Sequence, residues 1–349
     1  MLHLFVGIFV FFNTVKKGPF GAIPQHNLQT PTEYSAAKTI SAADLKQYLQ
    51  VLASDEFEGR ATGEIGQQLA ATYIADAFAK FGMKGLEKKS SFIQTYPIRY
   101  ADKFGQNVVG AIEGTSKKDE YIIISAHYDH LGIKDGVIYN GADDNGSGTA
   151  CLIELAKVFA KAKADGMSIK RSILFIAFSG EELGLLGSQY YTENPLVPFD
   201  NTVADLNMDM MGRRDTAHAD AVDYIYVIGA DKLSKELDQI ANAANDNYCQ
   251  LRMDYTYNSE KDPNHYYYRS DHYNFVKQGI PVIFYFNGVH ADYHQPSDKE
   301  DKIDYQLMEK RAQLVFHTAM ELANRSERIK LDVKQKKRHK HKHNTQNQD

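Results

Sequence analysis

The chain of 349 residues is long enough to bury a substantial core, as one large domain or two small ones. Hydrophobic residues make up 43% and charged residues 24%, which excludes a wholly disordered or collagen-like chain. The formal net charge is −5, but residues 330–349 hold seven Lys and Arg against two Asp, so residues 1–329 carry −10 and we expect no binding to nucleic acid.

The N-terminus begins with an apolar run of about a dozen residues over 2–12, which is too short to span a bilayer comfortably. It is typical of the apolar region of a signal peptide, although no Lys or Arg precedes it and no clear cleavage site follows. We therefore predict that residues 1–15 are a signal peptide or a hydrophobic N-terminus. The expected consequence is export to the periplasm or the medium, with no stable membrane association after processing.

Helical and strand patterns then alternate along the chain. Residues 41–44 predict a capping box that begins a helix, and apolar residues recur at helical spacing over 67–81 before Gly82. Further helical stripes cover 152–159 and 307–322, the first next to Cys151, which we expect to be a buried thiol. Short apolar runs predict strands at 107–112, 121–125, 172–178, 203–206, 224–228 and 281–286. The alternation predicts an α/β fold, with a mixed, mostly parallel central sheet sandwiched by helices.

The C-terminal residues 330–349 are basic, of low complexity and without apolar periodicity. They predict a disordered tail. The main body shows neither an internal repeat nor a Pro/Ser-rich linker, which favours one domain over two.

Acidic and imidazole side chains follow each strand predicted in the middle of the chain. Because ligands bind beyond the carboxyl ends of strands in open α/β sheets, we expect these side chains to meet at one edge. With only Cys151 and Cys249 in the chain, a metal site here must use His, Asp and Glu. The residues in question are His127, Asp129 and His130, the loop acids Asp143 and Asp144, Glu181 and Glu182, Asp209, and Asp292 and His294.

Nitrogen and oxygen ligands without thiolate suit Zn²⁺ or a similar divalent ion. The acids are too many for one zinc, whereas two ions about 3.5–4 Å apart could share a bridging carboxylate and hold a nucleophilic water. In the pair Glu181 and Glu182, one acid can bind metal while the other takes the proton of the water. Asp129 lies two residues after His127, so on a strand it would share a face with that ring and could orient it.

The segments that carry these residues are HYDH, GADDNGSG, GEELGLLGS, NMDM, RSDH and YHQPSD, preceded by SDEFEGRATGEIG. In this order and spacing the chain resembles the M28 family of co-catalytic zinc aminopeptidases, from about Leu45 to Leu322. The resemblance implies a single peptidase domain over residues 40–326. It also implies that no protease-associated domain is inserted, because residues 89–106 are too few to hold one.

The resemblance further implies roles for individual residues and two Zn²⁺ ions per chain. Asp144 would bridge the two ions and form a cis peptide with Asn145, a choice over Asp143 that the family pattern alone decides. Glu181 would be the general base and acid. The remaining ligands would be His127 and Asp209 for one zinc, and Glu182 and His294 for the other.

Two further residues in these segments, Tyr293 and Arg269, have two interpretations each. Tyr293 is placed as in relatives whose phenol stabilises the tetrahedral oxyanion, or it only packs beside His294. Arg269 contacts substrate, or it pairs with Asp271. Ser270, Asp271 and His272 do not form a nucleophilic triad, because adjacent residues rarely converge on one atom and the chain has no G-x-S-x-G motif.

The function implied is hydrolysis of the N-terminal residue from peptides with a free N-terminus, through a metal-bridging water that Glu181 activates. Alternatives are a glutaminyl cyclase-like acyltransferase with a single zinc, a dipeptidase or carboxypeptidase-type relative, and a member without activity. The last is disfavoured because all ligand positions and the base are filled. Side-chain preference stays open, because the tyrosines 255, 257 and 266–268 could either line the pocket or pack in the core. Oligomeric state also stays open.

Overall fold

The computed structural model describes residues 30–87, 91–99, 101–220 and 222–332. The predicted signal peptide over 1–15, and the tail beyond residue 332, lie outside the described residues. Within the described ranges, the structure contains no helix with the length and apolar character needed to cross a membrane.

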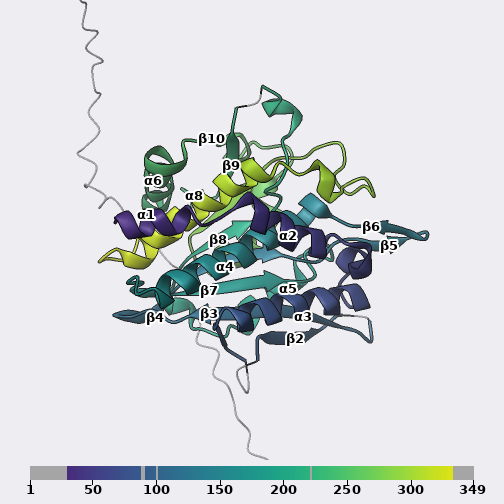
Figure 1. The fold of residues 1–349 in the computed structure, drawn as a ribbon, viewed down its shortest axis with the longest axis horizontal. Helices are drawn as coiled ribbons and strands as arrows, with labels where there is room; N and C mark the ends of the chain where they lie inside the picture. The colour runs from purple at the N-terminus through teal and green to yellow at the C-terminus, as the bar shows by residue number, and fades with distance from the viewer. Residues whose placement is uncertain (1–29, 88–90, 100, 221, 333–349) are drawn as a thin grey trace, which may run out of the picture.

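A mixed nine-stranded sheet forms the centre of the molecule (Figure 1), in the order β1-β3-β7-β4-β8-β11-β9-β10 with β2 paired to β3. Its central strands are parallel: β4 pairs in parallel with β7 and β8, and β8 with β11. Strand β3 is antiparallel to β7, β11 is antiparallel to β9, and β9 and β10 are parallel. The strands are β1 (Lys84–Gly85), β2 (Ile93–Pro97), β3 (Phe104–Ile112), β4 (Lys117–His127), β7 (Arg171–Phe178), β8 (Thr202–Met208), β9 (Tyr224–Ile228), β10 (Arg252–Asp254) and β11 (Val282–Phe286), and a separate hairpin holds β5 (Gly132–Lys134) and β6 (Val137–Tyr139).

Helices cover both faces of this sheet. Alternate residues of β4 point to opposite faces: Ile122 and Ile124 pack in the core cluster that includes residues of α2, α3, α4, α6 and α8, whereas Ile123 packs with residues of α5 and α7. This layering confirms the predicted α/β sandwich. The helices are α1 (Pro31–Ala37), α2 (Ala42–Leu52), α3 (Ile65–Lys80), α4 (Gly148–Ala164), α5 (Leu186–Glu193), α6 (Lys235–Ala244), α7 (His272–Lys277) and α8 (Tyr305–Asn324).

The local signals in the sequence are largely confirmed. Ser41 caps α2, since its hydroxyl accepts the amide of Asp44 at 3.1 Å. Cys151 is a fully buried free thiol in α4. The packed body extends before residue 40, because Glu33 of α1 accepts a hydrogen bond from the Asn324 amide at 2.6 Å at the end of α8. The boundaries 40–326 stay a prediction.

Candidate metal centre

The ends of the parallel strands bring the candidate ligands together. His127 is the last residue of β4, Asp209 directly follows β8, and Glu182 lies just beyond the end of β7. His294 lies in the loop after β11, and Asp144 lies in segment η3 (Ala142–Ser147), which leads into α4 and whose backbone is not helical at Asp144 and Asn145. Because β4, β7, β8 and β11 run in one direction, these residues meet at a single edge of the sheet, as predicted.

Two clusters of potential ligands share the carboxylate of Asp144. In the first, His127 Nε2 lies 3.5 Å from Asp144 Oδ1 and 3.2 Å from Asp209 Oδ1. In the second, His294 Nε2 lies 2.9 Å from Asp144 Oδ2 and 3.2 Å from Glu182 Oε1. Zinc bonds of 2.0–2.1 Å in a tetrahedron place neighbouring ligand atoms roughly 3.3 Å apart, so each cluster has dimensions that suit one ion.

Asp143, the alternative bridging residue in the sequence, is turned away from both clusters. Its Oδ2 lies 3.0 Å from His290 Nε2, and its Oδ1 accepts the amide of Gly212 at 2.7 Å. The backbone around it is held by Asp298, whose Oδ2 accepts the amides of Asp143 and Asp144 at 2.9 and 3.1 Å. The peptide between Asp144 and Asn145 is cis, as the resemblance implied.

A second imidazole, which the sequence analysis left without a role, completes the second cluster. His130 Nδ1 lies 3.0 Å from Glu182 Oε1 and 3.8 Å from Asp144 Oδ2. His130 follows His127 by three residues, beyond the end of β4, where the alternation of a strand no longer indicates which way a side chain points. The only available signal was its place in the HYDH segment.

The donor set of these clusters fits a divalent cation. Several of its buried atoms make no well-aligned hydrogen bond within the described ranges, although other donor atoms of the clusters lie close to some of them: His127 Nε2, both ring nitrogens of His130, and Glu182 Oε1. Burying polar atoms without partners costs free energy, and coordination to an ion removes that cost. Imidazole nitrogens and carboxylate oxygens without thiolate suit zinc and similar ions.

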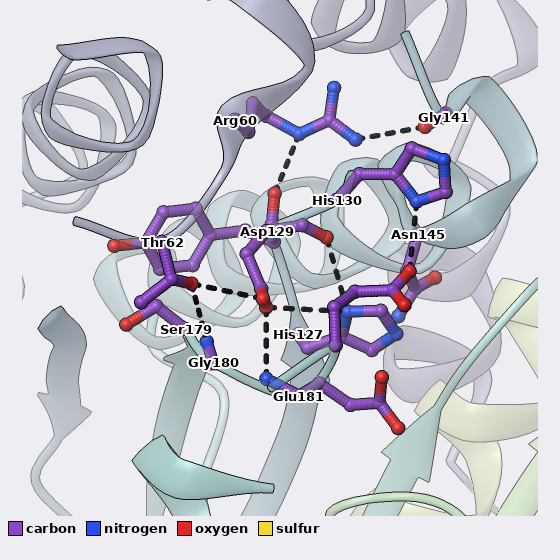
Figure 2. A network of polar contacts seen from close by, with 12 residues as sticks. Arg60, Thr62, His127, Asp129, His130, Gly141, Asn145, Ser179, Gly180 and Glu181 are labelled. Atoms are coloured by element: carbon purple, nitrogen blue, oxygen red, sulfur yellow. Dashed lines mark hydrogen bonds and ion pairs between the residues drawn. The ribbon is translucent and has the colours of Figure 1, made fainter. Parts of the chain in front are cut away.

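Asp129 links the first cluster to the backbone of the predicted base, Glu181 (Figure 2). His127 Nδ1 lies 3.3 Å from the Asp129 carbonyl oxygen and 3.6 Å from its Oδ1. The same Oδ1 accepts the Glu181 amide at 3.2 Å, and Oδ2 accepts the Thr62 hydroxyl at 2.9 Å. Asp129 is thus close enough to orient His127, but through a loop, because β4 ends at His127 rather than continuing to Asp129.

Ser270 supports the clusters from behind. Its hydroxyl donates to Asp209 Oδ2 at 2.7 Å and accepts the side-chain amide of Asn207 at 3.0 Å. This position suits orientation of Asp209 rather than attack on a substrate. His272 Nε2 lies 2.9 Å from the carbonyl oxygen of Tyr267.

A pocket opens beside the carboxylates of Asp144, Glu181 and Asp209. Its remaining lining is Met210, Tyr266, Arg269, Phe284, Phe286, Val289 and Tyr293. Of the tyrosines 255, 257 and 266–268, which could line the pocket or pack in the core, Tyr266 contributes to this lining.

The other tyrosines considered lie elsewhere. Tyr257 packs behind Tyr266, with ring centroids 4.6 Å apart, and Tyr255 donates to Asp238 at 2.7 Å. Tyr267 and Tyr268 line a separate pocket beside Lys232.

Arg269 and Tyr293 stand together at the pocket. The Arg269 guanidinium lies 4.9 Å from the centre of the Tyr266 ring, and one of its nitrogens is 3.5 Å from the Tyr293 hydroxyl. Neither of these guanidinium contacts in the described part of the chain is the expected ion pair with Asp271. The Tyr293 ring stacks on His294 with centroids 3.9 Å apart, so its hydroxyl is held near the second cluster.

The acid–base character of the site follows from burial and from the density of charge. Burial raises the pKa of Glu181 well above its usual value, and the charges of Asp209 and Glu182 add to this against the opposing effect of His127. Burial alone would lower the pKa of His294, but hydrogen bonds to Asp144 and Glu182 outweigh it and raise that pKa to about 10.

An α/β sheet whose carboxyl edge gathers two sets of His, Asp and Glu side chains around one shared carboxylate defines a candidate two-metal centre. The model of peptidase family M28 matches residues 107–319, and the chain belongs to this family.

Individual relatives agree with this assignment. The chain is 27% identical to Aminopeptidase YwaD of Bacillus subtilis over 68% of its length. It spans about half of such relatives: 49% of YwaD, and 55% of a probable leucine aminopeptidase of Arthroderma otae, to which it is 31% identical over 59% of its own length.

Solved structures show the same fold. The crystal structure of the LapA aminopeptidase of Legionella pneumophila superposes with a TM-score of 0.66 and 25% identity, over 84% of this chain and 75% of that one. Porphyromonas gingivalis glutaminyl cyclase superposes with a TM-score of 0.61 and 20% identity, over 80% of this chain and 97% of that one. The fold is therefore common to peptide hydrolysis and to cyclisation, and the site must distinguish them.

Proposed function

We propose that this protein is a zinc aminopeptidase with two ions per chain, which releases the N-terminal residue of peptides. The observation that carries the proposal is the pair of ligand clusters that share Asp144, with Glu181 beside both. The names of its relatives, aminopeptidase and zinc metalloprotease, support the same activity and the same metal. His127, Asp144 and Asp209 would hold the first ion, and Glu182 and His294, with Asp144, the second.

Glu181 is the proposed general base and acid. The bound zinc pair would supply Lewis acidity toward the scissile carbonyl and lower the pKa of water at the site. The Glu181 carboxylate accepts the proton of the attacking water and then delivers it to the leaving amine. The environment that raises its pKa in the metal-free protein favours holding this proton, while nearby cations favour the carboxylate before the attack.

Asp129 and Tyr293 have supporting roles in this proposal. Asp129 contacts both the His127 ring and the backbone amide of Glu181. It would therefore hold the metal ligand His127 and the base Glu181 in a constant position relative to one another. Tyr293 places its hydroxyl at the pocket beside His294, where it can donate a hydrogen bond to the oxyanion that forms at the scissile carbonyl.

The substrate is proposed to be a peptide with a free N-terminus and an apolar first residue. The carboxylates of Asp144, Glu181 and Asp209 in the lining of the pocket favour a protonated α-amine beside them. The apolar part of the lining, formed by Met210, Phe284, Phe286 and Val289, favours an apolar side chain. Export stays a prediction, since residues 1–15 lie outside the described ranges.

The test compares release of p-nitroaniline from leucyl p-nitroanilide by the native protein and by Glu181→Gln. We expect the variant to keep its fold and zinc but to lose at least a hundredfold in kcat, the low end of the effect of a general base. Glu193→Gln, an exposed change on α5, is the matched control and should retain full activity. A Glu181→Gln protein with near-native kcat would refute the role of Glu181.

Blocked substrates and metal content separate the alternatives. An aminopeptidase should not cleave N-acetylated peptides but should cleave peptides amidated at the carboxyl end, whereas a carboxypeptidase-type relative should do the reverse and a dipeptidase should require both ends free. A glutaminyl cyclase should bind one zinc per chain and convert N-terminal glutamine without releasing an amino acid. The presence of His127 and Asp209 in a separate first cluster favours the hydrolase.

A further inference from the structure

We propose that His130 is a fourth protein ligand of the second zinc, through its Nδ1. This inference rests on the zinc centre proposed above and goes beyond the ligand set that the resemblance implies. It makes the two metal sites unequal: His127, Asp144 and Asp209 provide three ligands at the first, whereas the second has four.

The first support is the position of the Nδ1 atom. It lies 3.0 Å from Glu182 Oε1 and 3.8 Å from Asp144 Oδ2, and the ligand atoms of His130, Asp144, Glu182 and His294 all lie within 4.8 Å of one another. His294 Nε2, on the same ion, lies 2.9 and 3.2 Å from these two oxygens. These four distances, from 2.9 to 3.8 Å, lie on either side of the roughly 3.3 Å expected between neighbouring ligand atoms of one tetrahedral zinc.

The second support is burial without hydrogen-bond partners. His130 is 2% exposed, and neither of its ring nitrogens makes a well-aligned hydrogen bond in the part of the chain that the structure describes, although Glu182 Oε1 lies 3.0 Å from Nδ1. An imidazole in this state has lost its hydrogen bonds to water without replacing them, which costs free energy. Coordination of Nδ1 to a cation would satisfy the nitrogen that faces the carboxylates.

The third support is the fit between the His130 ring and the loop that carries Asp144. Gly141 begins this loop with a φ of +54°, and a Cβ atom at this position would lie 2.3 Å from Cγ of the His130 ring. Only glycine leaves room for the ring while adopting this backbone conformation. The ring is therefore held by packing against the loop of the shared carboxylate.

A fourth ligand would change how the centre holds its ions. A zinc with four protein ligands can still hold the bridging water as a fifth ligand, whereas a zinc with three keeps one further position open for substrate. We expect the second ion to bind more tightly and to leave last when a chelator is added. The first site, formed by His127, Asp144 and Asp209, would retain the open position.

The experiment compares His130→Ala and His130→Asn with the native protein. Stepwise zinc affinities of the metal-free proteins are measured by competition with a chromogenic chelator, and zinc content is measured on the same samples. We expect the zinc affinity of the tighter site to fall roughly a hundredfold or more in both variants, while that of the weaker site stays unchanged. Removing a residue that only hydrogen-bonds to a metal ligand lowers affinity by about a hundredfold at most. The control His218→Asn removes another buried imidazole, bonded to Asp215 and Asp254, and should leave both affinities unchanged.

The asparagine variant separates a ligand from a hydrogen-bond donor, because its amide can still donate to Glu182. Native affinity in His130→Asn would overturn the inference. A structure of the zinc-loaded native protein, with the metal located by anomalous scattering, tests it directly even if His130→Ala does not fold. A distance from Nδ1 to zinc of about 2.0–2.1 Å is expected, and one beyond about 3 Å would overturn the inference.

These outcomes are distinguishable from failure of the proposed activity. A zinc-loaded protein with His130 coordinated but without aminopeptidase activity would refute the activity and leave the ligand in place. An active enzyme whose His130 ring stands free of the metal would refute only the ligand.

Discussion

Arg60 is a buried cation whose replacement should weaken both the fold and the metal centre. It lies at the end of the 3-10 segment η1 (Asp55–Arg60) and is fully buried. Its guanidinium donates to the carbonyl oxygens of Leu52, Tyr128, Asn140 and Gly141 at 2.5, 2.6, 2.7 and 2.8 Å (Figure 2 shows the bond to Gly141). The carbonyls of Tyr128 and Gly141 belong to the segments HYDH and GADDNGSG, which carry candidate ligands.

The size of the effect follows from these four hydrogen bonds. Burial lowers the pKa of Arg60 to about 10, so the group stays charged at neutral pH. Hydrogen bonds to a charged group contribute about 1.5–3 kcal/mol each. Arg60→Met removes all four and leaves the carbonyls without this donor, while the several kcal/mol spent on burying the charge are recovered. The expected net loss in the free energy of unfolding is about 3–5 kcal/mol.

Urea unfolding of the metal-free protein and zinc competition together provide the assay. Arg171→Met is the matched control, because Arg171 is also fully buried and donates to the carbonyls of Leu322 and Arg325 at 2.9 and 2.8 Å, but it lies at the opposite, amino-terminal end of β7. Both variants should unfold at lower urea, and only Arg60→Met should bind zinc more weakly.

Two results would contradict the expected role of Arg60. One is an unfolding free energy of Arg60→Met within 1 kcal/mol of native, well below the expected loss of about 3–5 kcal/mol. The other is equal zinc affinity in Arg60→Met and Arg171→Met. If Arg60→Met does not fold, Arg60→Lys keeps the charge with fewer hydrogen bonds and should show an intermediate loss.

Three further predictions concern the site and the core. Zinc should bind more tightly as pH rises from 6 to 9, by about tenfold per unit, because the metal displaces a proton from His294, whose pKa is about 10; calorimetry showing no pH dependence would contradict this. Asp205→Asn should raise the free energy of unfolding at pH 7 by about 4 kcal/mol. Burial raises the pKa of Asp205 from 3.8 to about 8, so its carboxyl group costs stability as pH rises from 4 to 8; urea unfolding at pH 4 and 7 should show the gain only at pH 7. Tyr293→Phe should lower kcat roughly a hundredfold without changing the melting temperature, and an unchanged kcat would exclude the Tyr293 hydroxyl as an oxyanion donor.

Patterns in the sequence alone predict the strands of the sheet and group most residues of the candidate site. Near-continuous apolar runs are required where a strand is buried on both faces, so strands such as β7 and β11 are visible without any tertiary information. The residues that follow such strands must lie at one edge when the strands are parallel. His127, Glu182 and Asp209 could therefore be grouped from their sequence positions alone.

Only the folded chain shows which of two neighbouring side chains points into the candidate site. Asp143 and Asp144 are indistinguishable by spacing, and only the path of η3 directs Asp144 to the clusters and Asp143 to His290. His130 lies beyond the end of β4, where the two-residue period no longer determines orientation.

Arg60 shows the same limit most clearly. An arginine next to a glycine in a polar segment is typical of a solvated surface. In the folded chain, however, Arg60 is fully buried and donates hydrogen bonds to four carbonyl oxygens. Sequence periodicity reports the environment of residues in regular strands and helices, because their side chains point in directions that the backbone repeat fixes. In loops no repeat exists, and the direction of a side chain depends on contacts with residues far away in the chain.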